Sequence, residues 1–346
     1  MRTPAVDAAL IARAARLIHD GKLVAFPTET VYGLGADADN VAAVRAIFAA
    51  KGRPANHPVI VHVASLQAAR AWAGELSPAA QALADRFWPG PLTLVVPRGA
   101  RAHDALTGAQ ESVGLRCPSH PWAQALLSAL HHQSGDSARA VAAPSANRFG
   151  GISPTRAEHV RSDLGEKPAG QVDLILDGGP CTVGIESTIV DLTVEAPRLL
   201  RPGSILRAQL EQTLGRAVGA AAIDDDSAPR ASGRLARHYA PRKPLELVEA
   251  AMLATRVRDL GPARVAVLAP APAASADRAA VALWLAAPDA PQPYALHLYG
   301  FLHAMDASGA ERLLVQRPPR GEAWAALHDR LERSCAEVTG RFDDAD

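Results

Sequence analysis

The sequence predicts a two-domain α/β protein, on three observations. Helical and strand signals alternate over about the first 205 residues. The alternation stops where alanine, glycine, an Asp-Asp-Asp run and scattered arginines replace the periodic apolar pattern, and it resumes afterwards. At roughly 150 residues per domain, 346 residues allow two domains. We therefore expect one domain at 1–206, a linker at 207–243 and a smaller domain at 244–346.

Side-chain spacing predicts the elements of the first domain. Leu10, Ala14, Leu17 and Ile18 share one face of an N-terminal helix that Gly21 ends. Further helices are expected over 41–51 and from the Ser77-Pro78 pair onward. Runs of β-branched and other apolar residues predict strands at 23–26, 59–63, 92–96, 113–116, 173–176 and 187–192.

The same alternation continues after the linker, which itself has a partly helical start. Strands are expected at 264–269 and 313–315, and helices at 296–305 and 323–337. The segment 279–285 fits either type. Strands that alternate with helices favour a parallel sheet, so the second domain is expected to be a smaller α/β domain.

Composition excludes several classes of protein. The chain has 36 Lys+Arg and 36 Asp+Glu, and this zero net charge argues against a dedicated basic nucleic-acid binder while leaving room for a local patch. An apolar content of 48% excludes global disorder. We find no apolar run of the roughly 20 residues that a membrane helix needs, and no signal-peptide core. Three distant cysteines in no metal or disulfide spacing fit a reducing cytoplasm.

No Walker A, GxGxxG, HExxH or GxSxG pattern occurs. The sequence therefore excludes the commonest phosphate-binding loops and hydrolase motifs. Polar residues instead follow the predicted strands, where α/β proteins tend to bind ligands. The segment 27–35 (PTETVYGLG) follows the first strand and offers several hydrogen-bonding groups on a stiff turn. An ordinary polar loop is the alternative.

Two basic residues come next. Lys51 and Arg53, held by Pro54, can present two cations to one polyanion such as a triphosphate, or they form a solvated basic helix end. His62 lies among valines, where a satisfied core histidine is the alternative to a ligand.

Arg116 lies on a predicted strand with Ser112 and Gly114 on the same face. A buried arginine is costly unless it meets an anion. That anion is either a substrate carboxylate or a structural Asp or Glu.

Short hydroxyl and amide side chains occur in the segment 144–147 (PSAN) and at Thr155, near an expected helix start. They suit phosphate or ribose recognition, and a plain helix cap is the alternative for Thr155. The segments 184–188 (GIEST) and 199–203 (LLRPG) are weak signals by themselves.

Taken together, these segments resemble the YrdC-like family from about residue 10 to 205. They are PTETVYGLG, KGRP followed by HP and IVH, WPGPLT, SVGLR, PSAN, SPT, GIEST and LLRPG, in the family's order and approximate spacing. The motif from Ser232-Gly233 to His238-Tyr239-Ala240-Pro241 resembles the linker of the long, two-domain form, the threonylcarbamoyl-AMP synthase family. The resemblance implies a twisted open-sheet catalytic domain and a Rossmann-like C-terminal domain.

The resemblance also implies a nucleotidyltransferase reaction. L-threonine, bicarbonate and ATP, the last with Mg²⁺, would give L-threonylcarbamoyladenylate and pyrophosphate. The product would pass to a separate tRNA-modifying machinery that makes N6-threonylcarbamoyladenosine in tRNAs decoding ANN codons. The family's YrdC-like surface is associated with double-stranded RNA, so weak RNA binding is a further expectation. Neither a membrane nor a protein-bound metal is expected.

The family's site residues carry over by position. Those expected to contact threonine are Thr30, His62, Arg116, Ser145 and Ser187. Those expected to contact ATP are Lys51, Arg53, His57, Ser112, Asn147, Thr155, Arg201 and Tyr239. Lys51 and Arg53 are also the expected catalytic residues, because cations must offset the repulsion between a carbamate and a triphosphate. His62 is a candidate general base on chemistry alone, with binding as its preferred role. A linker that crosses the site would close Tyr239 over ATP.

The sequence departs from the family pattern in places, and two other functions are weighed. His57 stands where many relatives have Asn, and 131–139 is an apparent insertion that we expect to be a surface loop. One alternative is the YrdC-like module of hydrogenase-maturation carbamoyltransferases, but the chain lacks the CxxC pairs of those proteins. The other is a non-catalytic RNA-binding module, against which the neutral net charge argues.

Overall fold

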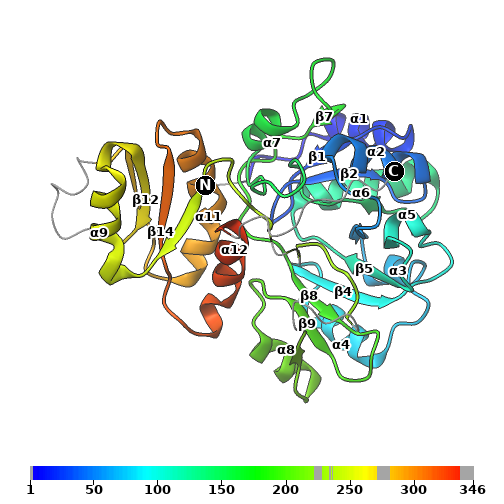
Figure 1. The fold of residues 1–346 in the computed structure, drawn as a ribbon. Coiled ribbons are helices and arrows are strands. Elements are labelled where there is room, and N and C mark those ends of the chain that lie inside the picture. The colour runs from blue at the N-terminus through cyan, green and yellow to red at the C-terminus, as the bar shows by residue number, and fades with distance from the viewer. Residues whose placement is uncertain (1–2, 222–227, 234, 236, 271–280, 336–346) are drawn as a thin grey trace. The chain divides into compact units, whose positions relative to one another are not determined.

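The computed structural model describes residues 3–221, 228–233, 235, 237–270 and 281–335 (Figure 1). Contacts between residues divide the chain into two compact units. The larger unit comprises Met1–Phe149, Ser153–Arg234 and Ala295–Tyr299, and the smaller unit comprises Gly150–Ile152, Leu235–Tyr294 and Gly300–Asp346. Each unit is built around its own sheet with helices, so the expected α/β class is confirmed.

Ten strands of the described residues form the sheet of the larger unit, in the order β10-β9-β8-β4-β5-β3-β6-β2-β1-β7. Parallel and antiparallel pairs are mixed: β3 and β8 run parallel to their neighbours β5 and β4, whereas β4 and β5 are antiparallel. The strands are β1 (Val24–Phe26), β2 (Gly33–Asp37), β3 (Val61–His62), β4 (Leu92–Pro97), β5 (Ser112–Arg116), β6 (Val141–Ala142), β7 (Leu174–Ile175), β8 (Thr188–Asp191), β9 (Arg198–Arg201) and β10 (Gly219–Ala220).

Several helices of this unit begin or end where the sequence supplies caps. The Asn40 side chain accepts hydrogen bonds from two backbone N–H groups at the start of α2, and Gly52 ends that helix in the left-handed conformation (φ 63°). Ser77 caps the helix that begins at Pro78. The helices are α1 (Ala8–His19), α2 (Val41–Lys51), α3 (Leu66–Ala69), α4 (Pro78–Phe87), α5 (Asp104–Thr107), α6 (Pro121–Ser134), α7 (Ala157–Asp163) and α8 (Arg207–Leu214).

Two large apolar clusters and a smaller one stabilise the described part of the larger unit. In one, Ile11 and Ile18 of α1 pack with Leu126 of α6 and with Val24 and Phe26 of β1. The other large cluster is more extensive, and its largest fully buried members are Tyr32, Leu34, Ile47, Trp72, Leu83, Leu92 and Leu94. At about 1.5–3 kcal/mol for each large side chain removed from water, these clusters fix the sheet that carries the candidate site.

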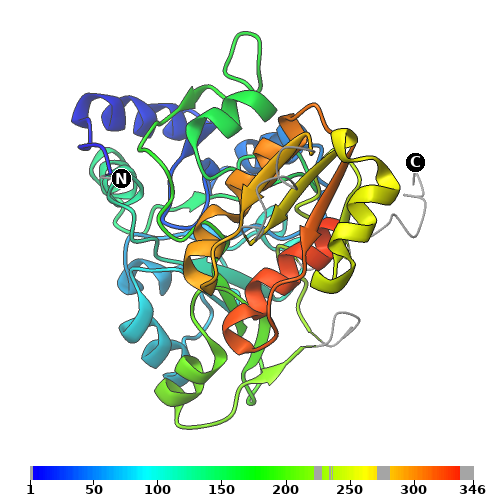
Figure 2. The same ribbon diagram turned by 90° about the vertical axis from the view of Figure 1, so that its left-hand side faces the viewer.

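The smaller unit is a parallel α/β unit. Its sheet has the order β11-β14-β12-β13, and every neighbouring pair is parallel, as expected. Figure 2 shows the helices α9 and α12 beside these strands. The elements are β11 (Leu245–Val248), α9 (Ala250–Leu260), η1 (Pro262–Arg264), β12 (Val265–Ala269), β13 (Leu283–Ala286), α11 (Pro291–Ala307), β14 (Arg312–Gln316), η2 (Glu322–Trp324) and α12 (Ala325–Cys335).

The structure differs from the expected elements in several places. The strand over 59–63 is reduced to Val61–His62, since the Val59 N–H bonds to the Leu106 carbonyl oxygen rather than to a neighbouring strand. The segment 33–37 forms β2 although it contains two glycines, a residue that is rare in strands. A Cβ at Gly35 would lie 2.8 Å from the Phe26 ring, so glycine is needed there for close packing. The ambiguous segment 279–285 contributes a strand, β13, and residues 336–337 of the last expected helix lie outside the described residues.

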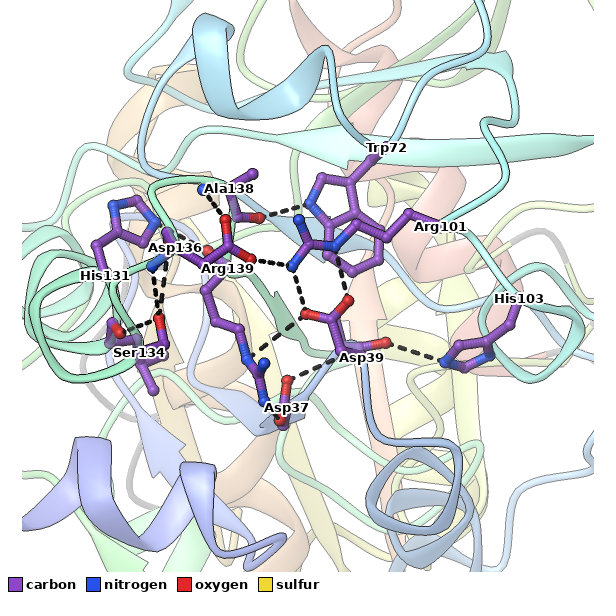
Figure 3. A network of polar contacts seen from close by, with 12 residues as sticks. Asp37, Asp39, Trp72, Arg101, His103, His131, Ser134, Asp136, Ala138 and Arg139 are labelled. Carbon is purple, nitrogen blue, oxygen red and sulfur yellow. Dashed lines mark hydrogen bonds and ion pairs between the residues drawn. The ribbon is translucent and has the colours of Figure 1, made fainter.

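The expected surface loop over 131–139 is confirmed only for 135–139, which lies outside any helix or strand and is partly or fully exposed. His131 to Ser134 form the last turn of α6, and the Arg139 guanidinium pairs with the buried Asp37 carboxylate (Figure 3). Arg101 joins the same network through a two-pronged contact of 2.6 and 2.8 Å with Asp39 and a 2.5 Å contact with Asp136. Ion pairs therefore attach this segment to the sheet. The sequence did not reveal them, because polar residues in a row also fit a solvent-exposed loop.

None of the described helices is long and apolar enough to cross a membrane.

Candidate functional site

The turn between β1 and β2 is buried and held by its own threonines. The Thr28 hydroxyl donates to the Val31 carbonyl oxygen (2.6 Å) and lies 2.8 Å from the Thr30 hydroxyl. It also accepts from the backbone N–H groups of Thr30 and Val31, at 3.2 Å each. Thr30 has no exposed surface. The reading of this segment as an ordinary polar loop does not describe it, because its polar groups lie in the interior.

The same turn supplies the acidic partner of Arg116. A nitrogen of the Arg116 guanidinium lies 2.8 Å from a Glu29 carboxylate oxygen, and the two side chains are 5% and 6% exposed. The other Glu29 oxygen accepts from the Ser119 N–H (3.1 Å). Of the two anions considered for Arg116, the structural carboxylate is present. The Nε donor of Arg116 has no hydrogen-bond acceptor among the described residues, so the guanidinium keeps capacity for a second anion.

His62 lies directly opposite Arg116, because β3 and β5 pair in that register. Burial, with the Arg116 charge beside it, lowers the pKa of His62 to about 3. The imidazole is therefore neutral near pH 7, and one nitrogen lies 3.3 Å from the Ile60 carbonyl oxygen. A base with so low a pKa removes protons poorly at neutral pH, so this geometry favours binding over general-base catalysis.

Ser187 and Arg201 meet at the neighbouring strands β8 and β9. The Ser187 hydroxyl lies 2.7 Å from the Thr93 hydroxyl and accepts from the Arg201 guanidinium at 3.1 Å. Arg201 also donates to the Ser187 carbonyl oxygen (3.1 Å) and, from another nitrogen, to the Ser232 carbonyl oxygen (2.9 Å). Arg201, which was expected to contact ATP, thus contacts Ser187, which was expected to contact threonine. Ser232, from the expected linker, lies against the same side chain.

Lys51 is the last residue of α2, and its ammonium group is buried against another segment. It donates to the carbonyl oxygens of Ser145 (2.6 Å) and Asn147. In the reverse direction the Phe149 N–H donates to the Lys51 carbonyl oxygen (2.8 Å). Burial, with the nearby Arg53 charge, lowers the Lys51 pKa well below its ordinary value. This cluster brings together three residues that were predicted separately.

Arg53 and His57 surround the ring of Phe149. The Arg53 guanidinium lies 5.7 Å from the ring centre and donates to the Pro58 carbonyl oxygen (2.8 Å). The His57 ring centre lies 5.4 Å from that of Phe149. Burial lowers the His57 pKa to about 4, with smaller contributions from the charges of Arg53 and Arg230. His57 is therefore an uncharged ring beside a cation at neutral pH.

The remaining predicted residues occupy three separate places. Ser112 begins β5, four residues before Arg116 and on the same face. Thr155 precedes α7, but the helix cap there is Arg156, so the alternative role of Thr155 as the cap is wrong. Tyr239 belongs to the smaller unit, has no exposed surface, adopts a left-handed backbone (φ 60°) and lies against Arg330 of α12, with the guanidinium 5.5 Å from the ring centre.

Ser112, Gly114 and Arg116 share one face of β5. A Cβ placed at Gly114 would meet only Ile60 and Thr93 side-chain atoms, each at 3.6 Å, so these neighbouring strands flank it on the face that also carries Ser112 and Arg116. Ser112 and Arg116 are about 13 Å apart at 3.3 Å per strand residue. Sequence reasoning missed Glu29, Thr93 and Glu186, although all three lie inside motifs that it noticed. Glu186 accepts from the Ser153 hydroxyl (2.5 Å).

Buried cations, one of them beside a pair of hydroxyl groups, in a two-unit α/β chain, define a protein that binds small anionic substrates. The chain belongs to the Sua5/YciO/YrdC family. The family model described as "Telomere recombination" matches residues 16–203, and the model described as "Threonylcarbamoyl-AMP synthase, C-terminal domain" matches residues 205–336.

Curated relatives carry one name. The threonylcarbamoyl-AMP synthase of Pyrococcus abyssi is 45% identical over 241 residues, which is 68% of this chain and 67% of the relative. That of Bacillus subtilis is 44% identical over 241 residues, which is 69% of this chain and 66% of the relative. The alignments therefore span about two thirds of these relatives.

Two solved structures of Pyrococcus abyssi Sua5 are also similar, each with a TM-score of 0.84 and each covering 96% of this chain. One is complexed with L-threonine; it is 35% identical, and 96% of that chain is covered. The other is a variant in which an adjacent histidine and tyrosine are replaced by alanine; it is 34% identical, and 94% of that chain is covered.

Proposed function

We propose that this protein is a threonylcarbamoyl-AMP synthase, which condenses L-threonine, bicarbonate and ATP into L-threonylcarbamoyladenylate and pyrophosphate. The observation that carries the proposal is Arg116. Its guanidinium is buried, partly neutralised by Glu29, and still has a donor that no described residue accepts. An amino-acid carboxylate satisfies that donor. The relatives' names and the threonine complex of the Pyrococcus abyssi protein support the choice of threonine.

The threonine end of the site is proposed to be the cluster around Arg116. Arg116 would bind the substrate carboxylate, while the neutral His62 ring and the hydroxyl groups of Thr30 and Ser187 accept or donate hydrogen bonds. Ser145 would complete this end. These groups fix the threonine amine, and fixed geometry supplies most of the rate enhancement when no protein nucleophile takes part.

The ATP end is proposed to be the cluster around Lys51. Lys51 and Arg53 would neutralise the triphosphate, and this contact would restore the charge that burial disfavours on Lys51. The other proposed ATP contacts are His57, Ser112, Asn147, Thr155, Arg201 and Tyr239. The adjacent His and Tyr replaced in the Pyrococcus abyssi variant are consistent with a role for His238 and Tyr239.

The chemistry follows in two steps. The threonine nitrogen bonds to the carbon of bicarbonate and water leaves, which gives N-carboxy-threonine. A carboxylate oxygen of this carbamate then attacks the α-phosphorus of ATP, and pyrophosphate leaves with the bond electrons. Lys51 and Arg53 reduce the repulsion between the two anions as they approach.

Magnesium is proposed to arrive with ATP rather than on protein ligands. Among the described residues, no group of three His, Cys, Asp or Glu side chains lies close enough to hold a metal ion. The nearest buried carboxylates are engaged: Glu29 with Arg116, and Glu186 with Ser153. The proposed role of Mg²⁺ is charge neutralisation on the triphosphate, and no step here depends on a protein-bound metal.

The chain is proposed to consist of a catalytic domain (1–206), a linker that crosses the site (207–243) and a C-terminal domain (244–346). The contact of Ser232 with Arg201 supports a linker that lies on the site. Exclusion of water matters here, because both the carbamate and the mixed anhydride hydrolyse. We place the protein in the cytoplasm, where its product would pass to the tRNA-modifying machinery.

One assay tests the function. The purified chain is incubated with ATP, Mg²⁺, bicarbonate and radiolabelled threonine, and pyrophosphate and a labelled adenylate are measured. We expect both products in equal amounts, with a requirement for threonine and bicarbonate. Release of phosphate or pyrophosphate that does not require threonine would contradict the proposal.

A further inference from the structure

The smaller unit contains a basic groove of about 700 Å³ that the proposed reaction does not use. Its walls come from the segment before β11, from β11 and β14, and from the ends of α9 and α12. The charged residues that line it are Arg237, Arg242, Lys243, Glu246, Arg256, Arg312 and Arg317. Six cations therefore face one carboxylate, in a chain whose net charge is zero.

The cations lie along the length of two parallel strands. Arg242 and Lys243 precede β11, and Arg312 begins β14, so these three mark one end of the groove. Arg317 follows β14 at the other end, about 16 Å away at 3.3 Å per residue. The positive charge is therefore an extended row rather than a single point.

Acidic neighbours hold part of this row without cancelling it. Arg242 lies 2.8 Å from Asp306, and Arg256 lies 2.8 Å from Glu246. Arg317 contacts Glu249 at 2.9 Å and Glu332 at 3.3 Å, but these carboxylates are 67% and 60% exposed. Exposed pairs of this kind contribute about 0–1 kcal/mol, so a phosphate can displace the carboxylate at little cost. Arg312 has no ion pair within the described part of the chain.

The lining also discriminates among phosphate ligands. Its described lining residues include no aromatic side chain on which bases could stack as they do in single-strand binding sites. The Arg242 side chain is 84% exposed, which suits contact with a large solvated backbone more than an enclosed small molecule. A repeating, exposed row of arginines is the usual partner of the sugar–phosphate backbone.

We propose that this groove binds the phosphate backbone of a folded RNA. The inference rests on the proposed function to this extent: the adenylate product is unstable in water, and the tRNA that finally receives its threonylcarbamoyl group is an RNA. A synthase that holds RNA shortens the distance that the product travels. The contact is electrostatic and independent of sequence, and it uses the smaller unit rather than the catalytic face.

Fluorescence anisotropy with the full chain tests the proposal. The probe is a fluorescein-labelled, unmodified transcript of a tRNA that decodes an ANN codon, titrated with protein over a range of KCl concentrations. The Arg242→Ala/Arg312→Ala variant removes two groove cations. Its matched control, Arg13→Ala/Arg45→Ala, removes two exposed arginines on α1 and α2 and changes the net charge equally.

We expect the groove variant to weaken binding about tenfold at moderate salt and to reduce the slope of log Kd against log [KCl] by about 2, one for each lost phosphate contact. The control should change Kd less than twofold. Equal weakening by both variants, no change in the groove variant, or no binding by the unaltered chain would overturn the proposal. Displacement of the RNA by pyrophosphate at an equal concentration of phosphate groups would also overturn it, because the groove would then be a small-anion site.

Threonine-dependent pyrophosphate release is measured on the same preparations. We expect it to stay within twofold in the groove variant. If the unaltered chain binds RNA through the groove but makes no adenylate, the proposed function fails while the groove stands. If it makes adenylate but the groove variant binds RNA normally, only the groove assignment fails.

Discussion

The Arg116 guanidinium is 2.8 Å from the Glu29 carboxylate. The two residues are far apart in the sequence, and their side chains meet in the interior of the larger unit. Glu29 lies on the turn between β1 and β2, and Arg116 ends β5. A buried pair of this kind orients the guanidinium before any substrate arrives. It also ties the threonine end of the proposed site to the stability of the fold.

Replacing Arg116 with Ala should raise the threonine KM by about 10- to 100-fold, which corresponds to the 1.5–3 kcal/mol of a charge-assisted hydrogen bond. The affinity for ATP, measured separately by calorimetry, should change less than threefold, because Lys51 contacts Ser145 and Asn147 at the end of α2, whereas Arg116 pairs with Glu29. An equal loss of threonine and ATP affinity would show that the two clusters are not separate sites.

The same substitution should lower stability by about 3–5 kcal/mol, because it leaves the Glu29 carboxylate buried without its cation. The Glu29→Gln/Arg116→Met double variant removes both charges and keeps similar volumes. It should recover most of the lost free energy of unfolding in urea while threonine use stays impaired. A double variant as unstable as Arg116→Ala would indicate that the pair is not the cause of the instability.

His57 should make stability depend on pH. Burial holds its folded pKa at about 4, whereas an unfolded histidine has a pKa of about 6.5. Between these values the unfolded chain binds a proton that the folded chain does not, so stability is lost as pH falls from about 6.5 towards 4. The ring is partly exposed, so we expect a loss on the order of 1 kcal/mol by pH 5.

Thermal unfolding of the His57→Asn variant from pH 7.5 to 5 checks this expectation. The melting temperature of the variant should fall less than that of the unaltered chain over this range. Parallel curves for the two proteins would contradict the assignment, since the other titrating groups are common to both.

Arg139 should contribute to stability and not to catalysis. Its guanidinium pairs with the buried Asp37, so Arg139→Ala should cost about 3 kcal/mol of unfolding free energy, with kcat and both substrate KM values within twofold. The matched control is Arg161→Ala. Arg161 is 45% exposed and lies 3.4 Å from a half-exposed Asp177, so its loss should cost less than about 1 kcal/mol. Similar losses from both substitutions would show that the network in Figure 3 is marginal.

Local signals predicted the parts of the fold that local chemistry controls. The helix over 41–51 was predicted with its observed bounds, because Gly52 adopts the left-handed conformation that ends it. The start of α4 was predicted for a similar reason, since Ser77 caps it and Pro78 fits its first turn. Strand β2 was missed because its glycines are selected by packing against Phe26, which no local pattern reveals.

For the candidate site, too, local patterns indicated the residue types but not the contacts between distant segments. Residue types and motifs indicated Lys51, Arg53 and Arg116 as candidates, and the structure places the first two beside the segment 145–149. The partner of Arg116 was left open as substrate or protein, because Glu29 is 87 positions away and its approach depends on how β1, β2 and β5 assemble. The arrangement of Arg139 with Asp37 is hidden for the same reason, at a separation of 102 positions.

The position of Lys51 has a consequence for mutational surveys. Its amine fastens the backbone of Ser145 and Asn147 to the end of α2, while the Phe149 N–H returns a bond to its carbonyl oxygen. The Lys51 side chain therefore stabilises the fold through its hydrogen bonds and is also the proposed counter-ion for the nucleotide. A library scored only by cellular abundance should already disfavour most replacements at Lys51, so intolerance there cannot by itself be attributed to catalysis.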